Sequence, residues 1–509
     1  MTKYDLALNS FSAVVFRPRR GRIENVFWFL ISTGIMCWTL NLALIATWLF
    51  IWGFAHYYNT KTEGNEFLMF FVGFYLFYPA LSTVFHDIHE QAVVLTVILI
   101  IFFLRYRSSC FRALFASKAL GFVFYGWILW GLIAYFPVLY INVIDKFVFQ
   151  KLFEESSGLF GFDRGSTVLK TALPMIVSPV VLLIPILGLR RESDLESFWA
   201  AIINGTLILC VLSLIRYIFY FDFIPQEYAD IHSHGFRMTG FSMPDPNGFA
   251  RMLLLPIVLI SALAIQSPGR LGINGWITLA LGLTCVILSY SRMSYLSLIF
   301  SLGSLLIFNM RKKRTLLFLI LSGVVVGSVL NFFDILSYFE PGADRASMVN
   351  FQIRLLIMDK TLRIISENPL FGAWPGGYSE AMFGQGYSGF LSVTDGRSVP
   401  STHNMVLNVA VEWGIPMAFL LLVALILSFV YGMRAIRQGG KGDYLTQGLV
   451  YGTTALCIGM FVHGITEIVG PYLVFFNLGL IFSLSRYRIL RGAAEHSGQR
   501  FFKQNWKAV

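Results

Sequence analysis

Residues 401–432 read STHNMVLNVAVEWGIPMAFLLLVALILSFVYG, and after His403 this stretch carries a single charged residue, Glu412. A helix needs about 20 mostly apolar residues to cross a bilayer, so we predict a membrane span over residues 404–432. His403 stands directly before the apolar run, between Thr402 and Asn404. An ionisable side chain at the edge of hydrocarbon is costly unless it is satisfied or useful. His403 is therefore a candidate base at a membrane face.

The whole chain shares this apolar character. Its 509 residues are 56% hydrophobic and only 13% charged, whereas a soluble domain averages about 25% charged residues. The net charge of +11 comes mostly from short loops between apolar runs, which is the positive-inside pattern of membrane proteins. We therefore predict an all-α polytopic integral membrane protein. Membrane lipids, and no nucleic acid, are the expected partners of its positive charge.

Apolar runs of spanning length predict about 12–14 transmembrane helices. Residues 26–55 are expected to form a tight hairpin broken near Asn41, and residues 91–104 are a shorter candidate. The clear candidate spans are residues 66–84, 119–140, 167–189, 197–221, 248–266, 271–289, 293–309, 315–331, 404–432, 446–467 and 471–486.

The basic residues also predict an orientation. The loop 105–118, the cluster RKKR at 311–314 and the tail from Arg486 should face the cytoplasm. Alternating the spans between these points puts residues 222–247 and 332–403 on the outer side. His403 should therefore lie at the outer face, at the end of the longest loop.

That loop contains a predicted amphipathic helix at residues 345–366, ASMVNFQIRLLIMDKTLRIISE. Apolar positions at helical spacing are separated there by charged ones, which is typical of a helix lying along the membrane surface. A lid or packing helix with a solvated charged face is the alternative. Glycines are frequent in the sequence that follows, NPLFGAWPGGYSEAMFGQGYSGF at 368–390, so this loop can bring backbone close to a ligand.

Cofactor and metal signatures are missing from the sequence. There is neither a dinucleotide-binding glycine motif after a strand nor a P-loop lysine. The segments HDIHE at 86–90 and HSH at 232–234 lack a third partner at fixed spacing. We therefore expect no metal and no cofactor.

The arginines of the outer face suggest phosphate chemistry. Arg237 and Arg292 are each, taken alone, more often interfacial anchors. Taken with a nearby histidine, arginines can hold a pyrophosphate through their planar guanidinium groups, and the histidine can take a proton from a hydroxyl. Transfer of a sugar from a lipid pyrophosphate is one reaction that such a set could perform.

Several short motifs follow one another over residues 235–430. They are RMTG at 237–240 with Pro246-Asn247, Ser291-Arg292, Arg354 leading to NPLFG at 368–372 and PGGY at 375–378, His403-Asn404, and Glu412 with GIP at 414–416. Their order resembles that of the O-antigen ligase/polymerase superfamily of bacterial inner-membrane proteins. The His-Asn and Glu-x-Gly-Ile-Pro element is the most specific part. Ala373-Trp374 departs from the small glycine-containing step that the family often has.

The resemblance implies an enzyme similar to C-type glycosyltransferases, all-helical and metal-independent. Such an enzyme takes glycan from undecaprenyl pyrophosphate at the periplasmic face of the bacterial inner membrane. Arg237 and Arg354 would clamp the pyrophosphate, and His403 would be the catalytic residue that activates the acceptor hydroxyl. The remaining substrate-binding candidates are Arg292, Glu412 and Asn404. Implied partners are the lipid-linked donor, a glycan, lipid A-core or protein acceptor, and other polysaccharide-assembly proteins.

With the resemblance, the chain divides into four predicted regions. These are N-terminal transmembrane helices at 1–234, a ligase/polymerase-like catalytic region at 235–432 that includes the periplasmic loop 332–403, C-terminal transmembrane helices at 433–486, and a basic cytoplasmic tail at 487–509.

Two alternatives to an enzyme stay open from the sequence. A polysaccharide or lipid-linked oligosaccharide transporter or flippase would show inverted repeats and charges within its spans, and neither is evident. A membrane scaffold is the third reading. Within the enzyme class, polymerase and ligase are not separated, because they share donor chemistry and differ in the acceptor.

Overall fold

The computed structural model describes residues 27–34, 42–62, 66–77, 88–115, 117–148, 172–189, 192–219, 238, 240, 246–309, 345–373, 378, 381–382, 402, 404–437, 444–464 and 471–496. These residues form helices and no β-strand. Six of the described helices are long and apolar enough to cross a membrane, and further apolar helices are shorter. The protein is therefore an all-α polytopic membrane protein. The total of about 12–14 spans stays a prediction.

The helices have the following bounds. They are α3 (Leu42–Thr62), α4 (Glu66–Phe77), α5 (Ile88–Arg105), α6 (Arg107–Phe115), α7 (Lys118–Val148), the 3-10 helix η2 (Ser178–Leu182), α10 (Leu183–Gly188), α11 (Glu192–Phe219), α13 (Pro246–Gln266), α14 (Pro268–Leu288), α15 (Arg292–Phe308), α17 (Arg345–Glu367), α19 (Met405–Trp413), α20 (Ile415–Arg437), α21 (Tyr444–Gly464) and α22 (Pro471–His496). The chain is helical on both sides of the predicted break near Asn41, which itself lies outside the described residues.

Helix α21 packs along both α13 and α15. Almost every residue of α13 is buried. Gly448 of α21 lies against Leu263 of α13, and Gly452 lies against Leu259, so the two helices run antiparallel. Glycine allows this approach because helix backbones pack closely where side chains are small.

Aromatic side chains pack the N-terminal helices. Trp52 of α3 stacks on Phe70 of α4 with ring centroids 4.5 Å apart. Phe71 of α4 stacks at 5.5 Å on Phe476 of α22, which joins the first helices of the chain to the last. The predicted N-terminal region is therefore packed into one bundle with the C-terminal helices.

The predicted span over residues 404–432 is divided in the structure. Gly414 has φ +83°, a left-handed conformation that favours glycine, and it separates α19 from α20. Only α20 is long enough to cross a membrane. The predicted span is therefore present as α20, and only its start at residue 404 is wrong. Composition hid the break, because the sequence is apolar on both sides of the glycine.

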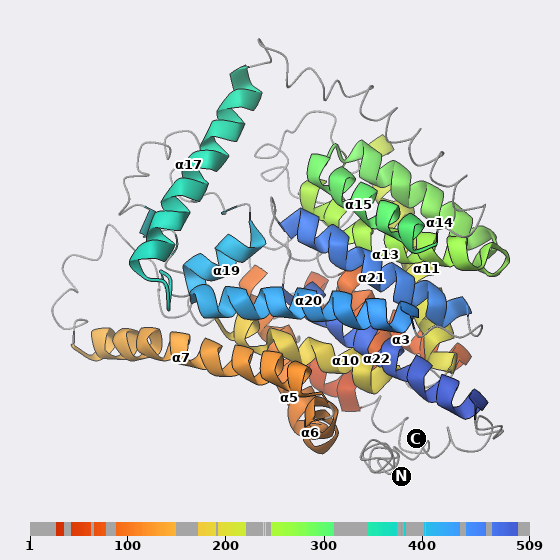
Figure 1. Ribbon diagram of the computed structural model, residues 1–509, viewed down its shortest axis with the longest axis horizontal. Coiled ribbons are helices and arrows are strands. Elements are labelled where there is room, and N and C mark those ends of the chain that lie inside the picture. The colour runs from red at the N-terminus through yellow and green to blue at the C-terminus, as the bar shows by residue number, and fades with distance from the viewer. Residues whose placement is uncertain are drawn as a thin grey trace.

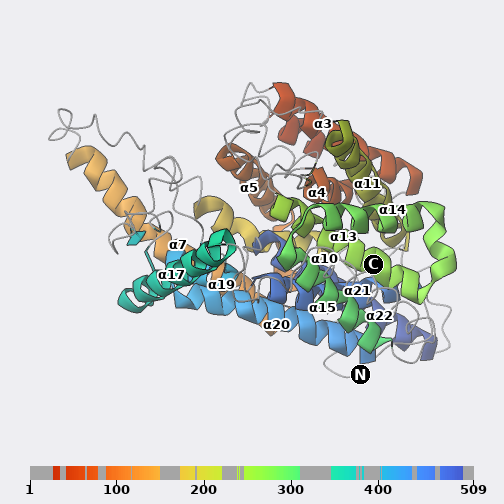
Figure 2. The ribbon, with the colours of Figure 1, turned by 90° about the horizontal axis from the view of Figure 1, so that it is seen from above.

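The amphipathic helix predicted at 345–366 is present as α17. Figures 1 and 2 show α17, α19 and the far half of α7 together at one side of the molecule, away from α3, α4 and α11. Of the side chains described on α17, Ile357, Ile364 and Ile365 are buried, and α17 packs on α19. The helix is therefore docked on the protein through one face.

Candidate functional site

Two motifs of the sequence interlock at the break between α19 and α20. The N–H of Ile415 donates to the carbonyl of Pro369 at 2.9 Å, and the N–H of Ala373 donates to the carbonyl of Val411 at 2.5 Å. We call this contact of residues 368–373 with residues 411–415 the 414 junction. It joins the NPLFG motif to the Glu-x-Gly-Ile-Pro motif through main-chain atoms.

Two glycines make the 414 junction possible. A Cβ on Gly414 would overlap the carbonyl oxygen of Leu370, and a Cβ on Gly372 would overlap that of Val411. Both glycines also have positive φ, +83° and +66°, where other residues are strained. At these two positions, glycine is required by both the conformation and the close approach of backbone.

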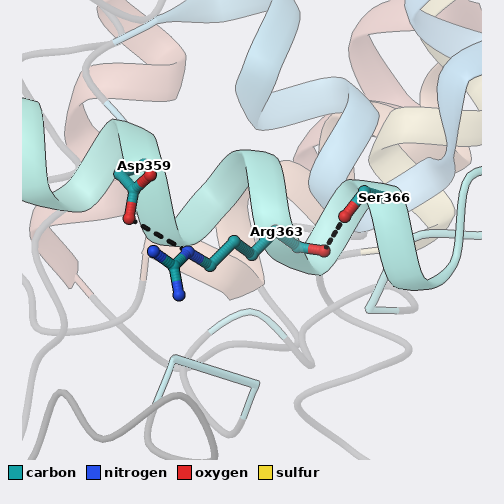
Figure 3. A network of polar contacts seen from close by, with 3 residues as sticks. All are labelled: Asp359, Arg363 and Ser366. Carbon is teal, nitrogen blue, oxygen red and sulfur yellow. Dashed lines mark hydrogen bonds and ion pairs between the residues drawn. The ribbon is translucent and has the colours of Figure 1, made fainter.

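Helix α17 leads into the 414 junction and includes Arg354. The side chain of Arg354 lies outside the described part of the chain. The charged face of α17 is exposed. Its Arg363 Nε and Asp359 Oδ2 form an ion pair at 3.1 Å (Figure 3), and the two side chains are 65% and 57% exposed. Ser366 Oγ donates to the carbonyl of Arg363 at 2.7 Å. Such exposed pairs contribute little to stability, so α17 is held mainly by its buried face.

Asn404 begins α19 as its N-cap. Its side-chain oxygen accepts a hydrogen bond from the N–H of Leu407 at 2.9 Å, and Thr402 Oγ1 donates to the carbonyl of Asn404 at 2.9 Å. The side-chain oxygen of Asn404, a predicted substrate-binding residue, thus has a local partner, which is the usual role of asparagine at this position. His403 lies between these two residues in sequence but outside the described residues.

Glu412 lies near the other end of α19, one helical turn beyond Asn408. Its side chain keeps some accessible surface, yet burial raises the pKa of the carboxyl from 4.5 to about 7. Near neutral pH the group is therefore present in both protonation states. It can accept a hydrogen bond from a sugar hydroxyl as a carboxylate or donate one as an acid.

A second contact lies beside the positions of Arg237 and Arg292. The N–H of Met238 donates to the carbonyl of Leu288 at 2.8 Å. We call this contact of Met238 with Leu288, together with Gly240, the 240 junction. Arg292 begins α15 four residues after Leu288, and Arg237 directly precedes Met238 in sequence. Arg237 itself and the side chain of Arg292 lie outside the described part of the chain.

A buried arginine holds the 240 junction in place. Arg216 of α11 is 9% exposed, and its Nη1 donates to the carbonyl of Gly240 at 2.6 Å. The ring of Phe249 occupies the place that a Cβ on Gly240 would need. Arg216 is not among the site residues predicted from the sequence. A signal was available, because arginine within an apolar span is rare and is often functional.

The start of α19 and the 240 junction lie at the same end of the bundle. Because α13 and α21 run antiparallel from the contact of Gly452 with Leu259, the end of α21 at Gly464 is about level with the start of α13. Met405 of α19 packs against Gly464. The beginning of α19 and the beginning of α13, close to residue 240, are therefore at one face of the membrane-spanning bundle.

Trp130 of α7 is a second residue that sequence reasoning missed. Its ring stacks on Phe371 with centroids 5.5 Å apart and planes 8° apart, and its Nε1 donates to the carbonyl of Trp413 at 3.0 Å. It therefore contacts both sides of the 414 junction. A tryptophan in an apolar run carries no local signal for such a role.

Comparison with known families gives one match. Residues 277–423 match the family model described as O-antigen ligase. That segment includes Arg292, Arg354, His403, Glu412 and the whole 414 junction, whereas Arg216 and Trp130 lie before it. The search of curated proteins and the search of solved structures gave no match.

Proposed function

Because residues 277–423 match the family model described as O-antigen ligase, we propose that the chain transfers a glycan from an undecaprenyl-pyrophosphate donor to an acceptor hydroxyl. The reaction takes place at the periplasmic face of the bacterial inner membrane. The observation that carries this proposal is that the 240 junction and the start of α19 lie at one end of the bundle. The chain segments next to Arg237, Arg292 and His403 begin there, and α17 with Arg354 packs on α19.

The proposed roles follow from side-chain chemistry. Arg237 and Arg354 hold the pyrophosphate, since the planar guanidinium binds phosphate through paired hydrogen bonds. Arg292 adds a third positive charge from the start of α15. Glu412, and Asn404 through its amide nitrogen, contact the sugar.

His403 acts as the general base. It takes the proton of the acceptor hydroxyl while the acceptor oxygen forms a bond to the anomeric carbon of the donor sugar. The bond from that carbon to the pyrophosphate oxygen breaks, and undecaprenyl pyrophosphate leaves with the bonding electrons. The arginines stabilise its negative charge in place of a metal ion, so a chelator should leave the rate unchanged.

The acceptor decides between polymerase and ligase. Purified protein given only lipid-linked repeat units should lengthen them if it is a polymerase. A ligase should need lipid A-core or a protein acceptor. Measuring product length with and without each acceptor separates the two activities.

Substitution of the three principal residues tests the mechanism. We expect His403→Ala, Arg237→Ala and Arg354→Ala each to lose glycan transfer while the protein still accumulates in the membrane. The loss at His403 should be about 10²–10⁴-fold, the usual contribution of a general base. Lysine at position 237 or 354 should also fail, because a point charge does not reproduce a two-pronged contact.

Arg363→Ala is the matched control, since Arg363 lies on the same helix as Arg354 with its side chain 65% exposed. It should transfer glycan at the wild-type rate. Near-normal turnover of His403→Ala at neutral pH would rule out the base. Labelling that places residue 403 on the cytoplasmic side would rule out the periplasmic site.

A further inference from the structure

The indole of Trp130, on helix α7, contacts both sides of the 414 junction. Trp130 donates its Nε1–H to the carbonyl of Trp413, the last residue of α19, at 3.0 Å. The carbonyls in the last turn of a helix have no partner within that helix, so this bond satisfies one of them. The same ring stacks on Phe371 in the loop that packs against α19.

The backbone of α7 is itself fixed on the bundle close to Trp130. Gly126 lies against Leu420 of α20, and a Cβ on Gly131 would come within 2.8 Å of Ile176. Helix α7 packs on α20 along this stretch. The position of the indole is therefore set by the membrane-spanning bundle, and the 414 junction is aligned to the bundle through the indole.

Trp127, one turn earlier on α7, shows the contrasting arrangement. Its Nε1 donates to the carbonyl of Met175 at 2.8 Å, and its ring meets Phe475 edge-on at 4.9 Å. It is fully buried in the bundle. Trp130 is only partly buried, and its partner Phe371 is 41% exposed. The rings of the Trp130 contact are less buried in the bundle, so the contact contributes less packing to overall stability while still fixing a geometry.

We propose that Trp130 is a positioning residue for the glycosyl transfer. It holds the loop 368–373 and the end of α19 in one place relative to the bundle. Since α17 leads into that loop and α19 follows His403, Trp130 sets the distance between the phosphate-binding and acceptor-activating groups. This inference rests on the proposed function for its catalytic consequence. Trp130 lies outside the segment that matches the ligase family, so the N-terminal helices contribute directly to the site.

The first test measures turnover in the full-length protein in detergent or nanodiscs. Trp130→Ala should lower kcat about tenfold or more, because small displacements of reacting groups have effects of that size, and the KM for the donor should change less. Trp130→Phe should lose less, since it keeps a ring opposite Phe371 and removes only the N–H donor. The control Trp127→Phe should lower the melting temperature and leave kcat per folded molecule unchanged.

A double variant separates positioning from general damage. If Trp130 acts through Phe371, Phe371→Ala should slow an already defective Trp130→Ala protein no further, because residues that act as a unit are not additive. Fully additive losses would overturn the inference. So would wild-type turnover of Trp130→Ala, or a loss that only follows the amount of folded protein.

A readout that needs no substrate completes the test. The amides of Ala373 and Ile415 donate the hydrogen bonds of the 414 junction, so hydrogen exchange at these amides reports its opening. Exchange should be faster in Trp130→Ala and unchanged in Trp127→Phe. Unchanged exchange in Trp130→Ala would overturn the positioning role. Faster exchange in a protein whose wild type transfers no glycan would instead refute the proposed function alone.

Discussion

The 414 junction and the 240 junction hold neighbouring parts of the candidate site by different means. At the 414 junction two segments contact each other through main-chain hydrogen bonds, and two glycines remove the side chains that would separate them. At the 240 junction one main-chain bond is supported by the guanidinium of Arg216 from a third segment. The 414 junction depends on two residues that have no side chain, whereas the 240 junction depends on one charged side chain. Substitutions should therefore damage them in different ways.

The largest effect is expected from Gly414→Ala. The added methyl would overlap the carbonyl of Leu370, and the backbone conformation is unfavourable for alanine. We expect a destabilisation of about 2 kcal/mol or more and loss of glycan transfer. Gly303→Ala in α15 is the control, since no atom lies within 4 Å of the added methyl. Melting temperatures in detergent check both, and a Gly414→Ala protein as stable as Gly303→Ala would contradict the interlocked backbone.

Arg216→Met should have the next largest effect. It removes the charged donor to the carbonyl of Gly240, and hydrogen bonds to charged groups contribute about 1.5–3 kcal/mol. We expect a lower melting temperature and about tenfold slower turnover, with partial recovery in Arg216→Lys. Arg270→Met, at an exposed position of α14, serves as the control. Equal turnover of the two methionine variants would show that the 240 junction does not need its buried cation.

Asn404 offers a smaller and sharper comparison. If its main role is to cap α19, Asn404→Ala should cost about 1 kcal/mol, and Asn404→Ser should restore most of that stability. If the amide nitrogen binds substrate, serine should restore stability without restoring the KM for substrate. Measuring melting temperature and KM on both variants therefore separates the observed cap from the predicted substrate contact.

The last comparison is a pH dependence at Glu412. Its pKa is raised to about 7 in the folded protein, so the folded state holds this proton more tightly than the unfolded chain. The group's contribution to stability is fully present below pH 4.5 and is lost as the pH rises through 7. Glu412→Gln should therefore be more stable than wild type at pH 8, and this difference should shrink toward pH 5. A difference that is constant from pH 5 to pH 8 would disprove the raised pKa.

Local patterns predicted some elements well. The amphipathic helix at 345–366 follows from its apolar spacing and is α17 in the structure. The span predicted at 404–432 begins only at Ile415, because hydropathy averages over Gly414 and does not register its positive φ. Asn404 caps α19 in the structure, and its contact with substrate stays a prediction. The roles of the other site residues also stay predictions: Arg237, Arg292, Arg354, His403 and Glu412.

The sequence by itself determined that this chain forms membrane-spanning helices. The length of an apolar segment and the placement of its flanking charges are local properties, and they determine how the segment inserts into a bilayer. It also pointed to the motifs of the ligase superfamily, which the family match at 277–423 bears out. Only the tertiary structure decided how those motifs meet. Trp130 and Trp413 are 283 residues apart along the chain, and Arg216 reaches Gly240 from another helix. Such contacts depend on how helices pack in three dimensions, and no local stretch of sequence encodes that packing.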